Sequence, residues 1–152
     1  MRYKRSETRL KYDSYNNDWE KTYYDLDTGG YLVTESKRLR LSLKSDNEKA
    51  KYAVENDMCE TLAKSGYHIE HVNKSYDIHI NGIKADLKKT CGSGNIEKYA
   101  KKAIREQGAE KVVFEFQNNS KEVQLKLLKL SKYYQIHGYY FFSNKKTKVY
   151  EF

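Results

Sequence analysis

The sequence predicts an α/β fold in which helices flank a mixed β-sheet. Two observations carry this prediction. Segments with the period of amphipathic helices alternate with short runs of β-branched and aromatic residues. From residue 45 onward, their order is helix, three strands, helix, strand, helix, two strands. The 152 residues suffice for one domain with a core. We therefore expect an α/β domain over residues 45–152, preceded by an extension over residues 1–44.

The N-terminal extension gives the weakest signals. Turn residues at 27–30 separate two β-prone runs and predict a hairpin over residues 21–33. Residues 38–43 alternate between polar and apolar and predict a short strand. Residues 11–19 are expected to form a flexible arm that packs only through its aromatic side chains. Those side chains are Tyr12, Tyr15 and Trp19.

A long helix is predicted from Ser45 or Asp46, either of which can cap it, to residue 64. Gly66 suits the position just after its end. One face is apolar. It carries Tyr52, Val54, Met58, Cys59, Leu62 and Ala63. The carboxylate of Glu55 falls in the middle of this face, where it is costly unless it is paired or bound to a cation.

The segment 76–88 predicts a β-hairpin that turns at Asn81-Gly82, the strongest short-range hairpin signal. In this register Asp77 lies directly opposite Asp86, and Lys88 shares their face. Carboxylates opposite each other, about 5 Å apart at Cβ, repel by about 3 kcal/mol at an effective dielectric constant of about 20. The pair predicts a bound positive charge, most simply a divalent cation beside Lys88.

Beyond the hairpin, Asn95 can cap a second helix over residues 96–107, which Gly108 would end. Gln107 lies within its apolar stripe, an unusual place for an amide that needs partners. Basic residues cluster on the opposite face. They are Lys98, Lys101, Lys102 and Arg105.

The remaining elements complete the sheet. A strand is predicted at 67–72, before the hairpin, and a buried strand is expected at 111–116. Residues 120–134 have the spacing of an amphipathic helix. The chain is expected to end in a hairpin with strands at 138–142 and 148–152 and a turn at 143–146.

Composition favours a polyanionic partner, since 29 Lys and Arg against 21 Asp and Glu give a net charge of +8. Cys59 and Cys91 show no disulfide or zinc spacing, so both are expected to be reduced thiols in a cytoplasmic setting. No long apolar run or secretory signal is present, and no membrane contact is expected.

Two strand carboxylates and a lysine, Asp77 and then Asp86-Leu87-Lys88, match the signature of the PD-(D/E)XK nucleases. The sequence resembles this superfamily over residues 46–117. In particular it resembles the C-terminal nuclease domain of contact-dependent inhibition toxins (CdiA) and relatives in phages and polymorphic toxins. Glu55 and Gln107 lie where the superfamily places an acidic residue and a frequent glutamine. Tyr76 departs from the signature, which has proline there.

The resemblance implies a PD-(D/E)XK core and a metal-dependent endonuclease that cuts RNA, with tRNA favoured, or DNA. Mg²⁺ or Mn²⁺ would be the cofactor, with Zn²⁺ a further candidate, and Glu55, Asp77 and Asp86 would be its ligands. Lys88 would orient or deprotonate the attacking water, and Gln107 would support the site. The resemblance also implies an immunity protein as partner and delivery into a target-cell cytoplasm. The nucleic-acid-binding candidates are Lys84, Lys98, Lys101, Lys102 and Arg105.

Alternatives remain open for each feature. Asp77, Asp86 and Lys88 could form a solvated face of an exposed hairpin, and Gln107 could bond only to nearby backbone. The basic helix face could be an ordinary solvated face. At the level of function, the alternatives are a non-catalytic nucleic-acid-binding or phage accessory module on a nuclease fold, and a protein-interaction domain of the immunity type.

Overall fold

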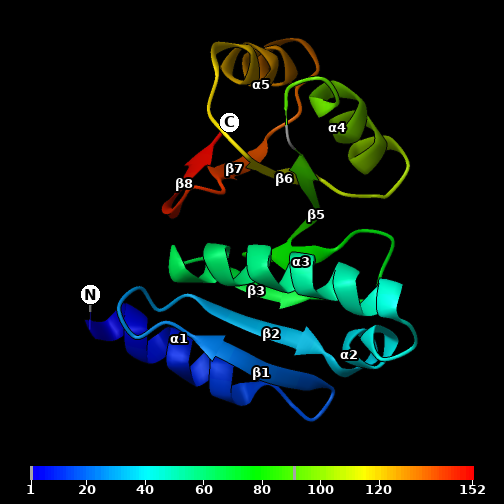
Figure 1. Ribbon diagram of the computed structural model, residues 1–152. Helices are drawn as coiled ribbons and strands as arrows, with labels where there is room; N and C mark the ends of the chain where they lie inside the picture. Colours follow the sequence, from blue (N-terminus) through cyan, green and yellow to red (C-terminus); the bar gives the residue numbers. More distant parts are fainter. Residues whose placement is uncertain (1, 91) are drawn as a thin grey trace. The chain divides into compact units, whose positions relative to one another are not determined.

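The computed structural model describes the backbone of residues 2–90 and 92–152, and the side chains of residues 7–90 and 92–152. The expected reduced thiol at Cys91 lies outside the described residues. The chain divides into two compact units, Met1–Gly82 and Ile83–Phe152. Each unit holds helices and a mixed sheet (Figure 1), and the order of elements from residue 45 onward is the predicted one.

The first unit, Met1–Gly82, contains a mixed sheet of four strands. Its elements are α1 (Arg2–Ser14), β1 (Trp19–Tyr24), β2 (Tyr31–Glu35), α2 (Ser36–Ser42), α3 (Asp46–Lys64), β3 (His68–His71) and β4 (Ile78–Ile80). Strand β2 is antiparallel to β1 and parallel to β3, and β3 is antiparallel to β4. The strands of the N-terminal extension therefore join the same sheet as β3, and the prediction of a separate domain over 45–152 remains a prediction.

Helix α3 begins and ends where the sequence predicts. The Ser45 hydroxyl accepts a hydrogen bond from the Glu48 N–H at 3.1 Å, which satisfies one of the first-turn donors. After the helix, Gly66 takes a φ of 101°, a conformation that favours glycine. On the apolar face Met58, Cys59, Leu62 and Ala63 are buried, Tyr52 is half-buried and Val54 is 43% exposed.

Two expectations for the N-terminal extension are wrong. Residues 2–14 form helix α1 where a flexible arm was expected from residue 11, although Tyr12, Tyr15 and Trp19 do pack together as predicted. Residues 36–42 form helix α2 instead of a strand. The residues that α2 buries, Arg38 and Ser42, are polar and four apart. That spacing places them on one helical face. The alternation of apolar residues over 38–43 has the two-residue period of a strand and therefore predicts the wrong element.

The predicted hairpin at 21–33 is confirmed as β1 and β2. Asp25 organises its turn, because one carboxylate oxygen accepts the N–H groups of Asp27 and Thr28 at 3.0 and 2.9 Å. The other oxygen accepts the Tyr23 hydroxyl at 2.8 Å. Burial raises the pKa of Asp25, but these hydrogen bonds, that from the Thr28 N–H foremost, outweigh it and lower the pKa below its ordinary value.

The substitution Asp25→Asn is expected to lower the free energy of unfolding by about 1 kcal/mol at neutral pH. A carboxylate with a lowered pKa stabilises the fold above its unfolded-state pKa, and this contribution is lost as the pH falls through the folded-state pKa. Urea unfolding between about pH 7 and about pH 2 checks this. A difference between wild type and variant that stays constant over that range would contradict it.

Gly30, directly before β2, packs on the end of α3. A Cβ at this position would lie 1.8 Å from the Ala63 carbonyl oxygen. Gly30→Ala is therefore expected to lower the free energy of unfolding by about 3 kcal/mol, because the backbone at Ala63 must move to admit the methyl group. Gly94→Ala, whose Cβ would meet nothing within 4 Å, is the matched control and should stay within about 0.5 kcal/mol of wild type. Equal melting temperatures for both variants would refute the close approach.

The second unit, Ile83–Phe152, also holds a mixed sheet. Its elements are β5 (Ile83–Thr90), α4 (Ile96–Arg105), β6 (Lys111–Phe116), α5 (Lys121–Tyr133), β7 (Gly138–Phe142) and β8 (Lys145–Glu151). Strands β5, β6 and β7 are parallel in sequence order, and β8 is antiparallel to β7. Helix α4 packs on β5 and β6 and against α5.

Local details in this unit refine the prediction. Ser120 caps α5 by accepting the Val123 N–H at 3.1 Å, whereas Asn95 makes no side-chain cap on α4. Helix α4 ends at Arg105, so Gln107 lies in the turn that follows it. The last hairpin turns over two residues, 143–144, and β8 begins earlier than expected.

The turn at Asn81-Gly82 has the predicted conformation. Asn81 and Gly82 have φ values of 48° and 83°, the pair of positive angles that a type I′ hairpin turn requires. The division between the units falls directly after this turn. The predicted register that sets Asp77 opposite Asp86 joins residues of different units and remains a prediction.

Candidate functional site

Three of the predicted site residues come together in the second unit. The Lys88 ammonium lies 2.8 Å from Asp86 Oδ2 and donates a hydrogen bond to Gln107 Oε1 at 3.1 Å. The Asp86 carboxylate is buried, with a side chain only 1% exposed. The ammonium approaches Oδ2 off the hydrogen-bonding direction, so this contact is an ion pair. Lys88 thus joins a buried acid to an amide.

Local structure explains why these residues meet. Asp86 and Lys88 are two apart on β5, so their side chains project from the same face of the strand. The chain leaves α4 through residues that fold back on the helix, with the Gln107 N–H bonded to the Lys102 carbonyl at 3.1 Å. Gly108 follows with a φ of 76°. The Tyr99 ring, whose centroid lies 5.9 Å from Lys88 Nζ, completes the surroundings of the ammonium.

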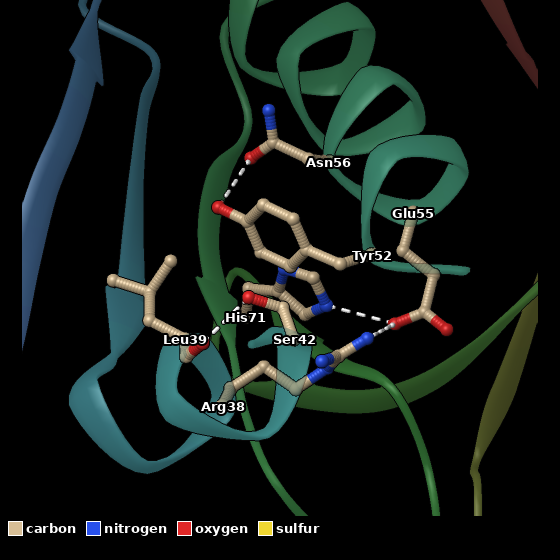
Figure 2. Close-up of polar contacts among 7 residues, drawn as sticks. All are labelled: Arg38, Leu39, Ser42, Tyr52, Glu55, Asn56 and His71. Carbon is tan, nitrogen blue, oxygen red and sulfur yellow. Dashed lines mark hydrogen bonds and ion pairs between the residues drawn. The ribbon is translucent and has the colours of Figure 1, made fainter. Parts of the chain in front are cut away.

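Glu55 has a different set of partners in the first unit. Its Oε1 accepts a hydrogen bond from Arg38 Nη2 at 3.2 Å and lies 2.9 Å from His71 Nε2 (Figure 2). Arg38 and His71 are themselves buried. Tyr52 stacks on the His71 ring at 5.5 Å between centroids and lies 5.3 Å from the Arg38 guanidinium. These contacts pair the carboxylate that the sequence left without a partner.

This cluster keeps Glu55 ionised and leaves one of its oxygens to spare. Burial raises the pKa of Glu55, but the hydrogen bond and charge of His71 and the charge of Arg38 outweigh it and lower the pKa. Both contacts fall on Oε1, and the other carboxylate oxygen points away from both partners (Figure 2).

Asp77 directly precedes β4, and its carbonyl accepts the Val72 N–H at 3.2 Å. Its carboxylate acts on the same buried thiol as that of Glu55. Burial raises the pKa of Cys59 well above its usual value, and the negative charges of Glu55 and Asp77 raise it further.

The metal-ligand prediction draws on both units: Glu55 and Asp77 in the first, Asp86 in the second. Among the described residues, the structure brings no group of three or more His, Cys, Asp or Glu side chains together in a way that could hold a metal ion. The chemistry of the donors nevertheless fits Mg²⁺ or Mn²⁺, because ionised carboxylates are the ligands these hard cations prefer. The proposed ligand set remains a prediction.

The predicted nucleic-acid-binding residues of α4 line a surface depression of about 420 Å³. Its lining is Lys98, Lys101, Lys102, Arg105 and Glu106. The Lys101 ammonium lies 4.1 Å from the Tyr134 ring centroid and 3.8 Å from a Glu97 carboxylate oxygen, whereas Lys98 and Lys102 are exposed. Lys84 is also exposed, on β5. Lys98 and Lys102 therefore present their charges to solvent at this depression.

Sequence reasoning missed Arg38 and His71. The signal for His71 was present, because it is in phase with the buried Ile69 on β3 and therefore faces inward. A buried glutamate in turn requires a buried cationic or hydrogen-bonding partner. Arg38 carried no such signal, since the segment around it has the pattern of a strand.

The sequence matches no protein-family model and no curated protein. Among solved structures, the fold is similar to a chain of the CdiA-CT/CdiI toxin and immunity complex from Burkholderia pseudomallei. The TM-score is 0.55 at 15% sequence identity, and the match covers 72% of this chain and 89% of the other. This likeness shows a shared fold. None of the helices in the described part of the chain combines the length and apolar character that a membrane crossing requires.

Proposed function

We propose that the chain is a metal-dependent endonuclease with a PD-(D/E)XK core that hydrolyses phosphodiester bonds in RNA, with tRNA favoured, or in DNA, and that it acts as a toxin. The observation that carries the proposal is the placement of Lys88 between Asp86 and Gln107. A lysine fixed by a buried carboxylate and an amide is suited to orienting a nucleophile or neutralising charge on a phosphate.

Each residue has a distinct role in this proposal. Glu55, Asp77 and Asp86 would hold the cation, and Lys88 would position the attacking water. Gln107 fixes the Lys88 ammonium through the 3.1 Å hydrogen bond, which limits where Lys88 can place its protons. When bound, a divalent cation polarises the phosphate and lowers the pKa of water.

The basic depression on α4 supplies the contact to the nucleic acid backbone. Its lysines and Arg105 can neutralise phosphates, and the net charge of +8 attracts a polyanion. Lys84, exposed on β5, is a further phosphate contact. These contacts would hold the substrate without reading its sequence.

The toxin assignment draws support from the shared fold with a chain of a toxin and immunity complex. A toxin that cuts nucleic acid needs a neutralising partner in the cell that makes it. We therefore propose an immunity protein as a partner, and an acidic one would complement the basic surface.

The test is cleavage of total tRNA, single-stranded RNA and plasmid DNA by wild type and Asp86→Ala in Mg²⁺, Mn²⁺ or EDTA. Wild type is expected to cut at least one substrate only with metal. Asp86→Ala should lower the rate by about 10³-fold, because a metal contributes several kcal/mol to transition-state stabilisation. Circular dichroism must show that the variant is folded. Cleavage that survives in Asp86→Ala would overturn the proposal.

A second candidate, a non-catalytic nucleic-acid-binding module, is favoured by one specific observation. Glu55 and Asp86 both have cationic partners within the protein, at 3.2 and 2.8 Å, so neither needs a metal to offset its burial. This candidate predicts salt-sensitive binding of tRNA or DNA with no metal-dependent cleavage of any substrate in the same assay.

A further inference from the structure

A groove of about 700 Å³ lies in the first unit. It is lined by residues 17–20 around the start of β1, by Glu35 at the end of β2, by α2, by the segment between β3 and β4, and by His79 of β4. None of the residues assigned above to metal binding or to phosphate contact lines it. Its volume is in the range of sites that hold small organic ligands.

One part of the groove lining is cationic. Lys37 and Arg40 come from α2, and Lys74 comes from the segment between β3 and β4. All three are exposed. Within the described part of the chain, none of them makes an ion pair or hydrogen bond through its side chain. Three cations without internal partners beside one hollow provide a place for a phosphate.

Trp19 supplies an aromatic wall. It is half-buried at the start of β1. The Tyr15 ring contacts it edge-on, 5.5 Å away between centroids, and fixes its orientation. An aromatic ring held in this way can stack against a nucleic acid base.

Acidic residues also line the groove, and any occupant must satisfy them. They are Asp18, Glu20 and Glu35. Glu35 already accepts the Asn73 N–H at 3.2 Å, which leaves its remaining acceptor positions for a ligand. Carboxylates repel a phosphate but accept hydrogen bonds from the amino groups of bases. A ligand with an anionic end and a donor-bearing end fits both linings.

We propose that this groove binds one nucleotide of a single strand, with the base against Trp19, its exocyclic amino group toward the carboxylates and its phosphate toward Lys37, Arg40 and Lys74. Bases with an exocyclic amino group are preferred over uracil. The proposal deepens the proposed function by adding a substrate subsite, but binding here requires neither metal nor cleavage.

Trp19 is the only tryptophan of the chain, so the tryptophan fluorescence comes from a single residue that lines the groove and contacts Tyr15. We would titrate the full chain in EDTA with guanosine 5′-monophosphate, uridine 5′-monophosphate and inorganic phosphate, using free N-acetyltryptophanamide to correct for absorption. Guanosine monophosphate is expected to quench the emission to saturation, and uridine monophosphate to bind about tenfold more weakly.

Arg40→Gln combined with Lys74→Gln is expected to weaken guanosine monophosphate binding at least about tenfold. Lys49→Gln is the matched control, because Lys49 is exposed on α3 and does not line the groove. Absence of saturable quenching, or equal affinity in the double variant and the control, overturns the subsite. EDTA removes metal-dependent cleavage, so a failed nuclease assay leaves this result interpretable, and a failed subsite leaves the nuclease proposal standing.

Discussion

Replacing Lys88 by methionine is expected to lower the free energy of unfolding by about 3–5 kcal/mol, the cost of leaving a buried charge without its partner. The Asp86 carboxylate is almost fully buried, and the Lys88 ammonium is 2.8 Å from its Oδ2. Methionine keeps much of the length and volume of the side chain but removes the charge. Urea unfolding in EDTA measures the change without interference from added metal.

Two further variants separate the ion pair from packing. Lys102→Met removes an exposed lysine of α4 and should change the unfolding free energy by less than about 0.5 kcal/mol. Asp86→Asn combined with Lys88→Met removes both charges and should recover most of the lost stability, since no buried charge is then unpaired. If Lys88→Met is as stable as Lys102→Met, the ion pair has no structural role.

The same variants bear on the proposed chemistry. The recovered double variant lacks both the carboxylate and the ammonium, so it should be folded and unable to cleave nucleic acid. A folded double variant that still cuts would remove Asp86 and Lys88 from the site altogether. Stability and cleavage therefore test separate claims about one pair of residues.

Local signals with a physical cause predicted much of the fold. The cap at Ser45 and the glycine at 66 place the two ends of α3, because each satisfies a geometric demand of a helix terminus. The Asn81-Gly82 turn was predictable for the same reason, since both residues tolerate positive φ. These elements are set by their own residues.

Helix α2 was not predictable because distant residues determine its buried face. Its apolar residues alternate, which indicates a strand. It buries two polar residues, Arg38 and Ser42, and the charge of Arg38 is stabilised by Glu55 of α3. A hydrophobic pattern cannot reveal a face that is buried through an ion pair. The helical conformation of this segment therefore depends on a tertiary contact, the ion pair between Arg38 and Glu55.

The candidate site was predictable only in part, for the same reason. Spacing along β5 identified Asp86 and Lys88, and an amide in an apolar stripe identified Gln107; the structure joins these three. The sequence also flagged Glu55 as a buried acid in need of a partner. It could not distinguish a metal from Arg38 and His71, because those residues lie 17 positions before and 16 positions after it.

Glu55→Gln is expected to cost about 3 kcal/mol or more of unfolding free energy, whether or not the protein binds metal. Glutamine keeps the size of the side chain and can still accept a hydrogen bond, but it leaves the buried Arg38 without a counter-charge. Urea unfolding in EDTA checks this against Glu60→Gln, a matched change on the same helix. Glu60 is half-buried, so Glu60→Gln should lower the free energy of unfolding by less than about 1 kcal/mol.

Combining Glu55→Leu with Arg38→Met separates the structural role of Glu55 from a catalytic one. The ion pair then becomes apolar, so part of the stability lost in Glu55→Gln should return, while the buried His71 Nε2 loses the carboxylate oxygen that lies 2.9 Å from it in wild type. If Glu55 also ligates the metal, this stable variant will bind Mn²⁺ more weakly than wild type in a titration followed by electron paramagnetic resonance. Unchanged Mn²⁺ affinity in the stable double variant would confine Glu55 to its ion pair with Arg38. The ligands would then have to come from Asp77, Asp86 and water.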